Sequence, residues 1–404
     1  MDPSHLSSAP LSIGDENGQK AYRAAAHEWL EKNIPLAWRP ENVGYTAPNF
    51  DEQRDFERRL YADGKLAGWT WPQAYGGQGQ TMIEHLIGNE EIGRFSPPES
   101  VNGAGKEMVG PILLAIGTEE QKKRFLPRIL SMEDIWCQGF SEPEAGSDLA
   151  AIRTRATEKD DGWCVDGSKI WTSAAQNADY CLLLARTGDR AQKHGSLTLF
   201  AVPLTVNGVT VKPIRQINGL SNFYEIFFDD VRIPAEAVIG EVNLGWPAAT
   251  KVLEIERALN RMYRAARFEN ELRHLISVCR HDPALEAQIR TAAVYEPLAN
   301  FFVDLEVLRR LVRSTVTKLV SGEAIGAVGS MIKLHWSEAH QRFLEVAHSL
   351  LGHASSPMQP AVARAVARFD DLYLRGRAES IMAGASAVQL DVIANRILRL
   401  PRTG

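Results

Sequence analysis

The apolar residues of this 404-residue chain change their spacing twice, and the order of these patterns limits the fold. From about Gln19 to Met132 they recur with the helical period, from Gly162 to Pro234 they form short alternating runs between turns, and beyond Gly245 the helical period returns. Because βαβ units need strands and helices to alternate throughout, this order argues against a doubly wound sheet. We predict a multidomain α+β protein with a helical domain over residues 1–133, a β domain over 134–243 and a second helical domain over 244–404.

Local signals indicate where individual elements begin and turn. Thr118 followed three residues later by Gln121 is a capping box, which predicts a helix start. Alternating apolar residues predict strands over Leu197–Val202 and Glu225–Phe228. The Asp-Gly pair at positions 166–167 lies between two apolar runs and predicts the turn of a two-residue hairpin.

Charge and cysteine content exclude several classes of partner. The formal net charge of -5 provides no basic field for nucleic acid or an anionic membrane surface. There is no apolar run of about 18 residues that could span a membrane, and residues 1–12 lack the apolar core of a secretory signal. The four cysteines are widely spaced, and His335 and His340 do not share a helix face, so we expect reduced core thiols and no metal. A cytoplasmic location is the resulting expectation.

Two motifs of the β zone carry the candidate chemistry. In the loop of residues 136–149, Gly139, Gly146 and Ser147 are expected to leave backbone N–H groups free to meet a ligand. The run from Glu142 to Asp148 has no obvious structural necessity, which favours a binding function. The second motif, residues 169–173, places an indole beside a hydroxyl. A tryptophan at such a position is more commonly a core residue, so only its pairing with the loop favours a ligand.

Together these two motifs resemble those of the acyl-CoA dehydrogenase family. Further matches follow in order along the chain at Trp71–Gly77, Gly117–Lys122, Phe227–Pro234 and, in a worn form, Ile381–Gln389. The resemblance covers most of the chain. It implies an α-helical N-terminal domain, a β-barrel-like middle domain and a C-terminal four-helix bundle.

The resemblance also implies FAD as the cofactor and an acyl-CoA thioester as the substrate. Dehydrogenation across the α and β carbons needs a base and a hydride acceptor, and no side chain accepts a hydride. By resemblance Trp171 stacks on the flavin, and Ser173, Gln138 and Ser141 form hydrogen bonds to its N5 and carbonyl edge. Ser147 is also expected to contact substrate. The full set assigned to the cofactor is Gln138, Gly139, Phe140, Ser141, Gly146, Ser147, Trp171, Thr172, Ser173 and Gln389.

The catalytic base is the main departure from the family. Many members carry a Glu in the closing motif just before its Gly, where this chain has Ala383. Others carry it on the first helix after the β domain, directly before an Arg, and by resemblance Glu256 is then the base and Arg257 the CoA-contacting Arg. Helix geometry favours Glu256 over Glu254, because Glu256 lies closer to the centre of an apolar stripe. That stripe consists of Val252, Ile255, Leu259 and Met262. The alternatives are that both glutamates are solvated and that the base has been lost.

The adenine half of the cofactor site is also altered. Ala385 and Ala387 replace the Thr and the acidic residue that are usual in the closing motif, and the Arg-Thr-Phe-Gly segment used for the neighbouring subunit's pyrophosphate is not visible. Arg280 or Arg290 are candidates to replace it.

Three functions therefore stay open for this chain. The leading one is a dehydrogenase of lipid catabolism that forms a trans-2-enoyl-CoA and passes electrons to an electron-transfer flavoprotein or similar acceptor. The second is a non-catalytic or half-site subunit paired with a homologous subunit. The third is a flavin oxidase or monooxygenase on the same fold. We expect a homo-oligomer or a hetero-oligomer.

Overall fold

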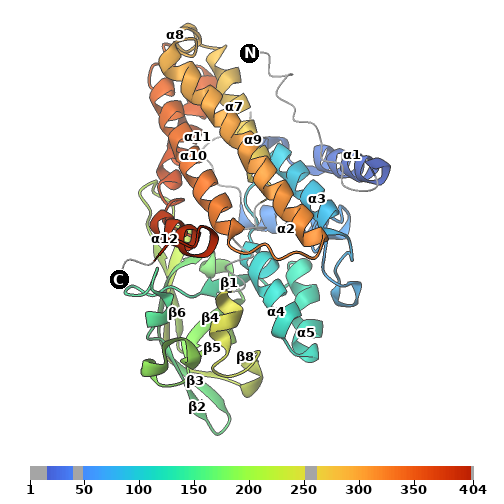
Figure 1. Ribbon diagram of the computed structural model, residues 1–404, viewed down its shortest axis with the longest axis vertical. Coiled ribbons are helices and arrows are strands. Elements are labelled where there is room, and N and C mark those ends of the chain that lie inside the picture. The colour runs from blue at the N-terminus through green and yellow to red at the C-terminus, as the bar shows by residue number, and fades with distance from the viewer. Residues whose placement is uncertain (1–15, 40–48, 251–261, 402–404) are drawn as a thin grey trace. The chain divides into compact units, whose positions relative to one another are not determined.

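The computed structural model describes residues 16–39, 49–250 and 262–401, which fall into two compact units (Figure 1). The helical unit comprises the described parts of residues 1–52, 80–98 and 255–404, and the sheet unit comprises those of residues 53–79 and 99–254. Each unit has its own hydrophobic core. Among the described residues, no helix has the length and apolar character that a membrane crossing needs.

The helical unit is built around a bundle of four long helices. These are α7 (Arg264–Cys279), α9 (Ala292–Val320), α10 (Val328–Leu351) and α11 (Pro360–Gly376). Its other elements are α1 (Glu16–Asn33), η2 (Leu36–Trp38), α3 (Met82–Phe95), α8 (Pro283–Gln288), α12 (Ser386–Val392) and the π-helical turn η9 (Ile393–Ile397). Apolar side chains from all four long helices meet in one core, among them Leu272, Phe301, Phe343 and Phe369. The returning helical period of the sequence therefore marks the buried faces of this bundle.

The sheet unit combines short helices with one eight-stranded sheet. Its helices are α2 (Phe50–Ala62, which begins in the helical unit), η3 (Gln73–Tyr75), the π-helix η4 (Gly105–Val109), α4 (Gly110–Ile116) and α5 (Glu119–Leu130). Its strands are β1 (Trp136–Gly139), β2 (Arg155–Lys159), β3 (Gly162–Ser173), β4 (Tyr180–Arg186), β5 (Leu197–Pro203), β6 (Val209–Ile214), β7 (Phe223–Ile233) and β8 (Val238–Ile239). Four 3-10 turns connect them: η5 (Leu149–Ala151), η6 (Ala175–Asn177), η7 (Arg190–Ser196) and η8 (Ala235–Ala237). The strand order is β6-β7-β3-β2-β4-β5-β8, and β1 pairs with β4 in parallel.

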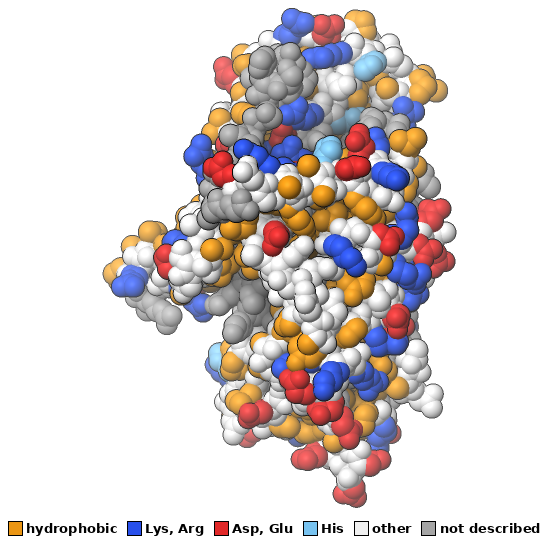
Figure 2. All heavy atoms as spheres, turned by 90° about the vertical axis from the view of Figure 1, so that its right-hand side faces the viewer, with side chains coloured by type: hydrophobic (Ala, Val, Ile, Leu, Met, Phe, Trp, Pro, Cys, Tyr) orange, Lys and Arg blue, Asp and Glu red, His pale blue; other side chains and the backbone are white. Residues whose placement is uncertain are grey.

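Several local predictions are confirmed. Thr118 caps α5 in a capping box, in which the Gln121 backbone N–H donates to Thr118 Oγ1 at 3.2 Å and the Gln121 side chain accepts from the Thr118 backbone N–H at 3.1 Å. The two predicted strands lie within β5 and β7. Charged side chains of both signs are interspersed over the face shown in Figure 2, as the small net charge suggests.

The predicted hairpin turn at positions 166–167 is wrong. β3 runs without interruption through this Asp-Gly pair, and the pairing of β3 with β7 shifts register there, so the pair forms a β-bulge. Gly167 has φ of +140°, and a Cβ at this position would lie 2.7 Å from Thr154 Cα. The β2–β3 hairpin turns instead between Lys159 and Gly162. β3 continues as one strand because β7 pairs with it on both sides of position 166, and local sequence does not reveal this long-range pairing.

Gly110 offers a test of the packing between α4 and Trp71, which lies in the loop between α2 and η3. A Cβ at Gly110 would lie 2.0 Å from two ring atoms of the buried Trp71 side chain. We expect Gly110→Ala to lower the free energy of unfolding by roughly 1–3 kcal/mol, because the indole must leave its position. Denaturant unfolding measures this change. Gly195→Ala is the control, since a Cβ there meets no atom within 4 Å, and equal stability of the two variants would contradict this packing.

Candidate functional site

The first candidate motif begins in β1, whose position is fixed by a buried asparagine. Asn102 is fully buried, its Oδ1 accepts from the Trp136 backbone N–H at 2.9 Å, and its amide nitrogen donates to two backbone carbonyls. Gln138 is half-buried, whereas Gly139 is buried at the end of β1. A Cβ at Gly139 would lie 2.6 Å from Cys181 Sγ. The glycine is therefore required by packing against β4, a reason that the sequence did not reveal.

A buried ion pair holds the loop that follows β1. Lys169 is fully buried in β3, and its Nζ donates to Glu142 Oε1 at 2.8 Å and to the Phe140 carbonyl oxygen at 2.9 Å. Glu142 also accepts from the backbone N–H groups of Arg153, at 2.6 Å, and Thr154, at 2.9 Å. Contrary to the sequence interpretation, Glu142 thus has a clear structural necessity. Nothing in the spacing of positions 142 and 169 indicates this pairing.

Electrostatics keep this pair charged at neutral pH. Burial lowers the pKa of Lys169 to about 8, and the neighbouring Glu142 carboxylate opposes that change. Burial alone would raise the pKa of Glu142, but the Lys169 ammonium and the N–H donors hold that pKa below its ordinary value. The start of the loop, at Phe140 and Glu142, is consequently tied to β3 by charged hydrogen bonds in a low-dielectric environment. Glu142 in turn ties this start to Arg153 and Thr154, beyond the other end of the loop.

The tip of the loop is exposed above this buried anchor. Residues 142 and 145 bond to each other through both backbone groups, at 3.1 and 3.0 Å, and the Ser141 carbonyl oxygen accepts from the Ile170 N–H at 2.9 Å. Gly146 and Ser147 are exposed, and a Cβ at Gly146 would meet no atom within 4 Å. The loop therefore presents an accessible tip on a fixed base, as a binding loop requires.

The second motif contains a strained and exposed tryptophan. Trp171 has φ of +61° and lies where the β3–β7 register shifts between Lys169 and Thr172. Its indole is 57% exposed and meets Phe223 edge to face at 6.2 Å between ring centroids. A left-handed backbone at a bulky residue costs of order 1–3 kcal/mol and is concentrated at ligand sites. The exposure rules out the alternative that Trp171 is a core residue.

Two buried polar groups near the predicted cofactor positions lack a partner within the described part of the chain. Thr172 is 1% exposed, and its hydroxyl has no hydrogen-bond partner there. In the helical unit, Gln389 on α12 is fully buried, and neither of its amide atoms has such a partner. An unpaired buried polar group costs about 1–3 kcal/mol unless a ligand or water satisfies it. Each of these two groups is therefore available for a hydrogen bond to a ligand. Ser173 is exposed and pairs in register with Phe223.

The other predicted site residues are not part of these two motifs. Glu254, Glu256 and Arg257 lie outside the described residues. Arg280 is exposed at the end of α7, and Arg290 is exposed and paired with Glu286 at 2.7 Å. Over residues 16–39, 49–250 and 262–401, no group of three or more His, Cys, Asp or Glu side chains is placed to hold a metal ion.

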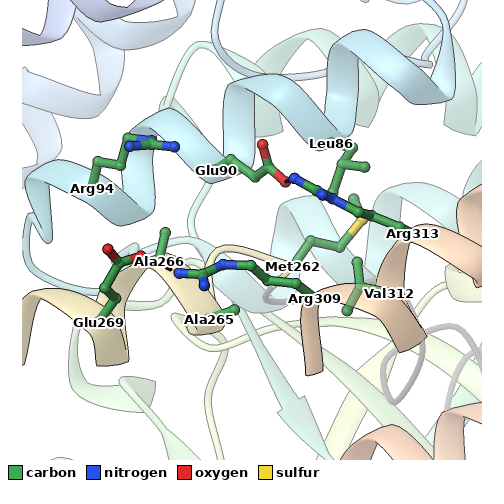
Figure 3. Close-up of a pocket in the computed structure, with 10 residues that line it drawn as sticks. All are labelled: Leu86, Glu90, Arg94, Met262, Ala265, Ala266, Glu269, Arg309, Val312 and Arg313. Atoms are coloured by element: carbon green, nitrogen blue, oxygen red, sulfur yellow. Dashed lines mark hydrogen bonds and ion pairs between the residues drawn. The ribbon is translucent and has the colours of Figure 1, made fainter. Parts of the chain in front are cut away.

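A small pocket of the helical unit lies between α3, α7 and α9 (Figure 3). Four of its charged residues pair within it, Glu269 with Arg309 and Glu90 with Arg313, the latter pair at 3.6 Å, and Arg94 pairs with Glu91 at 3.2 Å. Because these opposite charges satisfy each other, we assign this pocket no ligand.

Family models match nearly the whole chain. The N-terminal, middle and C-terminal domains of acyl-CoA dehydrogenase match residues 16–133, 137–231 and 243–398. Acyl-CoA dehydrogenase IpdE1 of Mycobacterium tuberculosis is 35% identical over 390 residues, which cover 94% of this chain and 97% of that protein. The solved structure of the Tcur3481-Tcur3483 steroid ACAD is 30% identical with a TM-score of 0.83, covering 97% of this chain and 100% of that chain. The ChsE4-ChsE5 complex from Mycobacterium tuberculosis is 28% identical with a TM-score of 0.82, over 97% of this chain and 100% of that chain.

The chain belongs to the acyl-CoA dehydrogenase family. It is an oxidoreductase of the class that acts on CH–CH groups, and members of the family are FAD-binding flavoproteins. The resemblance drawn from the motifs is confirmed, as are the predicted order of helical, sheet and helical domains and the cofactor.

Lys169→Met tests the buried ion pair. The variant leaves the Glu142 carboxylate buried without its cation, so we expect the free energy of unfolding to fall by about 3–5 kcal/mol. The double variant Lys169→Met/Glu142→Gln should lose less than the sum of the two single variants, as denaturant unfolding would measure. Lys20→Met removes an exposed pair with Glu16 and should leave the unfolding midpoint nearly unchanged. Full additivity of the two single changes would show that Lys169 does not anchor the loop.

Proposed function

We propose that this chain dehydrogenates an acyl-CoA thioester to the trans-2-enoyl-CoA with Glu256 as the base, and passes the electrons to an electron-transfer flavoprotein or similar acceptor. The observation that carries the proposal is the exposed indole of Trp171 on a strained bulge, next to a buried Thr172 hydroxyl without a partner in the described chain. A protein maintains strain and an unsatisfied hydroxyl together where a ligand compensates for both.

FAD, when bound, supplies the acceptor for the hydride that leaves the β-carbon. The exposed face of Trp171 is available for stacking, and the hydroxyls of Thr172 and Ser173 are available as hydrogen-bond donors. The ion pair of Glu142 and Lys169 keeps the adjacent loop in place before the ligand arrives, so its dipoles need little reorganisation. The further residues that we assign to the cofactor are Gln138, Gly139, Phe140, Ser141, Gly146, Ser147 and Gln389.

Glu256 is assigned the removal of the α-proton. The closing motif, residues 381–389, contains no Asp or Glu, and Ala383 occupies the position of the usual base. The base must therefore come from another segment, and a carboxylate in an apolar setting has the raised pKa that the task needs. Arg257 and the exposed Ser147 are assigned to the CoA thioester.

The proposed substrate is the CoA thioester of a steroid-derived acid. This choice is supported by the likeness to the Tcur3481-Tcur3483 steroid ACAD. All four cysteines are buried free thiols, which supports the proposed cytoplasmic location.

A second candidate function is that of a half-site subunit completed by a homologous subunit. The loss of polar side chains at Ala383, Ala385 and Ala387 favours it, and one of the similar solved structures is described as the ChsE4-ChsE5 complex. Purification of the chain alone separates the two candidates. A yellow protein with acyl-CoA turnover supports the leading one, whereas a preparation that gains flavin and turnover only with a homologous subunit supports the second. Rapid oxygen consumption without an added acceptor would indicate an oxidase.

Glu256→Gln tests the assigned base. We expect turnover of a steroid acyl-CoA with an artificial electron acceptor to fall by roughly 10²–10⁴-fold, because the amide cannot take the α-proton. The visible flavin spectrum should be unchanged. Glu254→Gln, two residues away on the same segment, is the matched control and should keep its turnover. Undiminished turnover of Glu256→Gln would remove Glu256 from the mechanism.

A further inference from the structure

His340, in the middle of α10, is held between two carboxylates in the core of the helical unit. Its ring is 2% exposed. Nε2 lies 2.9 Å from Glu271 Oε2 on α7, and Nδ1 lies 2.8 Å from Glu379 Oε2 in the segment after α11. The ring of Phe268 stacks on the imidazole at 3.8 Å between centroids and 15° between planes. His340 thus links Glu271 to Glu379, which lies 108 positions later in the sequence.

The geometry requires a doubly protonated imidazole. A carboxylate accepts hydrogen bonds, so each ring nitrogen that faces one must carry a proton. Burial by itself would lower the pKa of His340, but the carboxylates of Glu379 and Glu271 raise it to about 9. Burial would likewise raise the pKa of Glu271, and the His340 charge holds it below its ordinary value. His340 and Glu271 therefore carry opposite charges at neutral pH.

The charged groups around this cluster come from every neighbouring element. On α7, Arg267 also acts on Glu271. On α11, Arg368 acts on both Glu271 and His274, and Arg364 acts on His274. Burial and these arginines lower the pKa of His274 to about 4, so that histidine is neutral near pH 7 and above. His340 is consequently the group of this cluster whose charge changes on the alkaline side.

Glu379 is the third residue of the closing segment, here defined as residues 377–389. Other residues of α10 also contact the start of this segment. Gln341, next to His340, donates from Nε2 to the Gly376 carbonyl oxygen at 2.7 Å and to Ser380 Oγ at 3.0 Å. Arg377 pairs with Glu345 at 2.7 Å. Ala383, further along the same segment, has φ of +52°, a strained conformation that persists only in fixed surroundings.

We propose that His340, as an imidazolium between Glu271 and Glu379, is the positioning residue that sets the closing segment of this dehydrogenase and, through it, buried Gln389. The proposal rests on the proposed function, in which Gln389 belongs to the cofactor site. His340 acts through Glu379 and need not touch the flavin or the substrate. When His340 loses its proton, its charged hydrogen bond to the Glu379 side chain is lost, and the closing segment is released.

The sign of the pH dependence follows from the raised pKa. Histidine has an ordinary pKa near 6.5, so the stability that the cluster contributes is complete below about pH 6.5 and is lost as the pH rises through about 9. We expect amide hydrogen exchange of the peptide over residues 377–389, corrected for intrinsic exchange, to rise with a midpoint near pH 9. The value of kcat/KM for an acyl-CoA should decline over the same alkaline range, in which Lys169, with a pKa of about 8, also loses its proton.

Glu379→Gln gives the decisive comparison. This variant retains a hydrogen-bond acceptor but removes one of the two charges that raise the His340 pKa, so the alkaline midpoint of the exchange should move about one unit or more to lower pH. His340→Gln should lack this alkaline transition in the exchange of the closing segment. His348→Gln is the matched control, because His348 lies on the same helix and pairs with Asp370 in a half-exposed position. It should retain the wild-type midpoints.

Hydrogen exchange separates failure of this proposal from failure of the proposed function. If the exchange midpoint moves in Glu379→Gln but no acyl-CoA is turned over at any pH, the positioning role of His340 is supported and the proposed function fails. If the exchange midpoints for wild type and Glu379→Gln coincide, or if His340 titrates near pH 6.5 by ¹³C-histidine NMR, the positioning role of His340 is overturned. Should Glu379→Gln fail to fold, the titration midpoint of His340 in the wild type, measured by NMR, tests the proposal by itself: a midpoint near pH 9 supports it and one near pH 6.5 overturns it.

Discussion

The buried ion pair between Lys169 and Glu142 is the interaction on which the proposed flavin-binding segments depend. It joins β3 to the loop after β1 and places two functional segments, far apart in the sequence, in one fixed geometry. Lys169 is two positions before Trp171 on β3, and Glu142 is five before Ser147 on the loop. The charged pair holds the two segments together because it is desolvated and because each carboxylate oxygen of Glu142 also accepts a backbone N–H.

The strain at Trp171 is understandable only on such a rigid base. A tryptophan in a left-handed conformation would relax if β3 could slide along β7, but the pairing with β7 on both sides of Trp171 and the anchored Lys169 prevent this. The bulge turns the indole outward, whereas the neighbouring Thr172 side chain is buried. A single irregularity of one strand therefore supplies both an aromatic surface and an unsatisfied hydroxyl, the two features that a flat polar cofactor needs.

The helical unit uses buried charge in the same way. His340 links α7, α10 and the segment beyond α11, just as Lys169 links a strand and a loop. Both clusters contain a cation that loses its charge in alkaline solution. The pKa of Lys169 is about 8, because burial lowers it, and the pKa of His340 is about 9, because the two carboxylates raise it.

The sequence by itself determined the order of helical and sheet zones, the capping box at Thr118 and the family, because periodicity, capping and ordered motifs are local properties. It did not determine the bulge at positions 166–167, the necessity of Glu142 or the two carboxylates around His340. These depend on residues brought together from distant positions, and burial then changes their pKa values. Only the tertiary structure could decide which polar residues form buried ion pairs and which, such as Thr172, have no hydrogen-bond partner in the described chain and are available to a ligand.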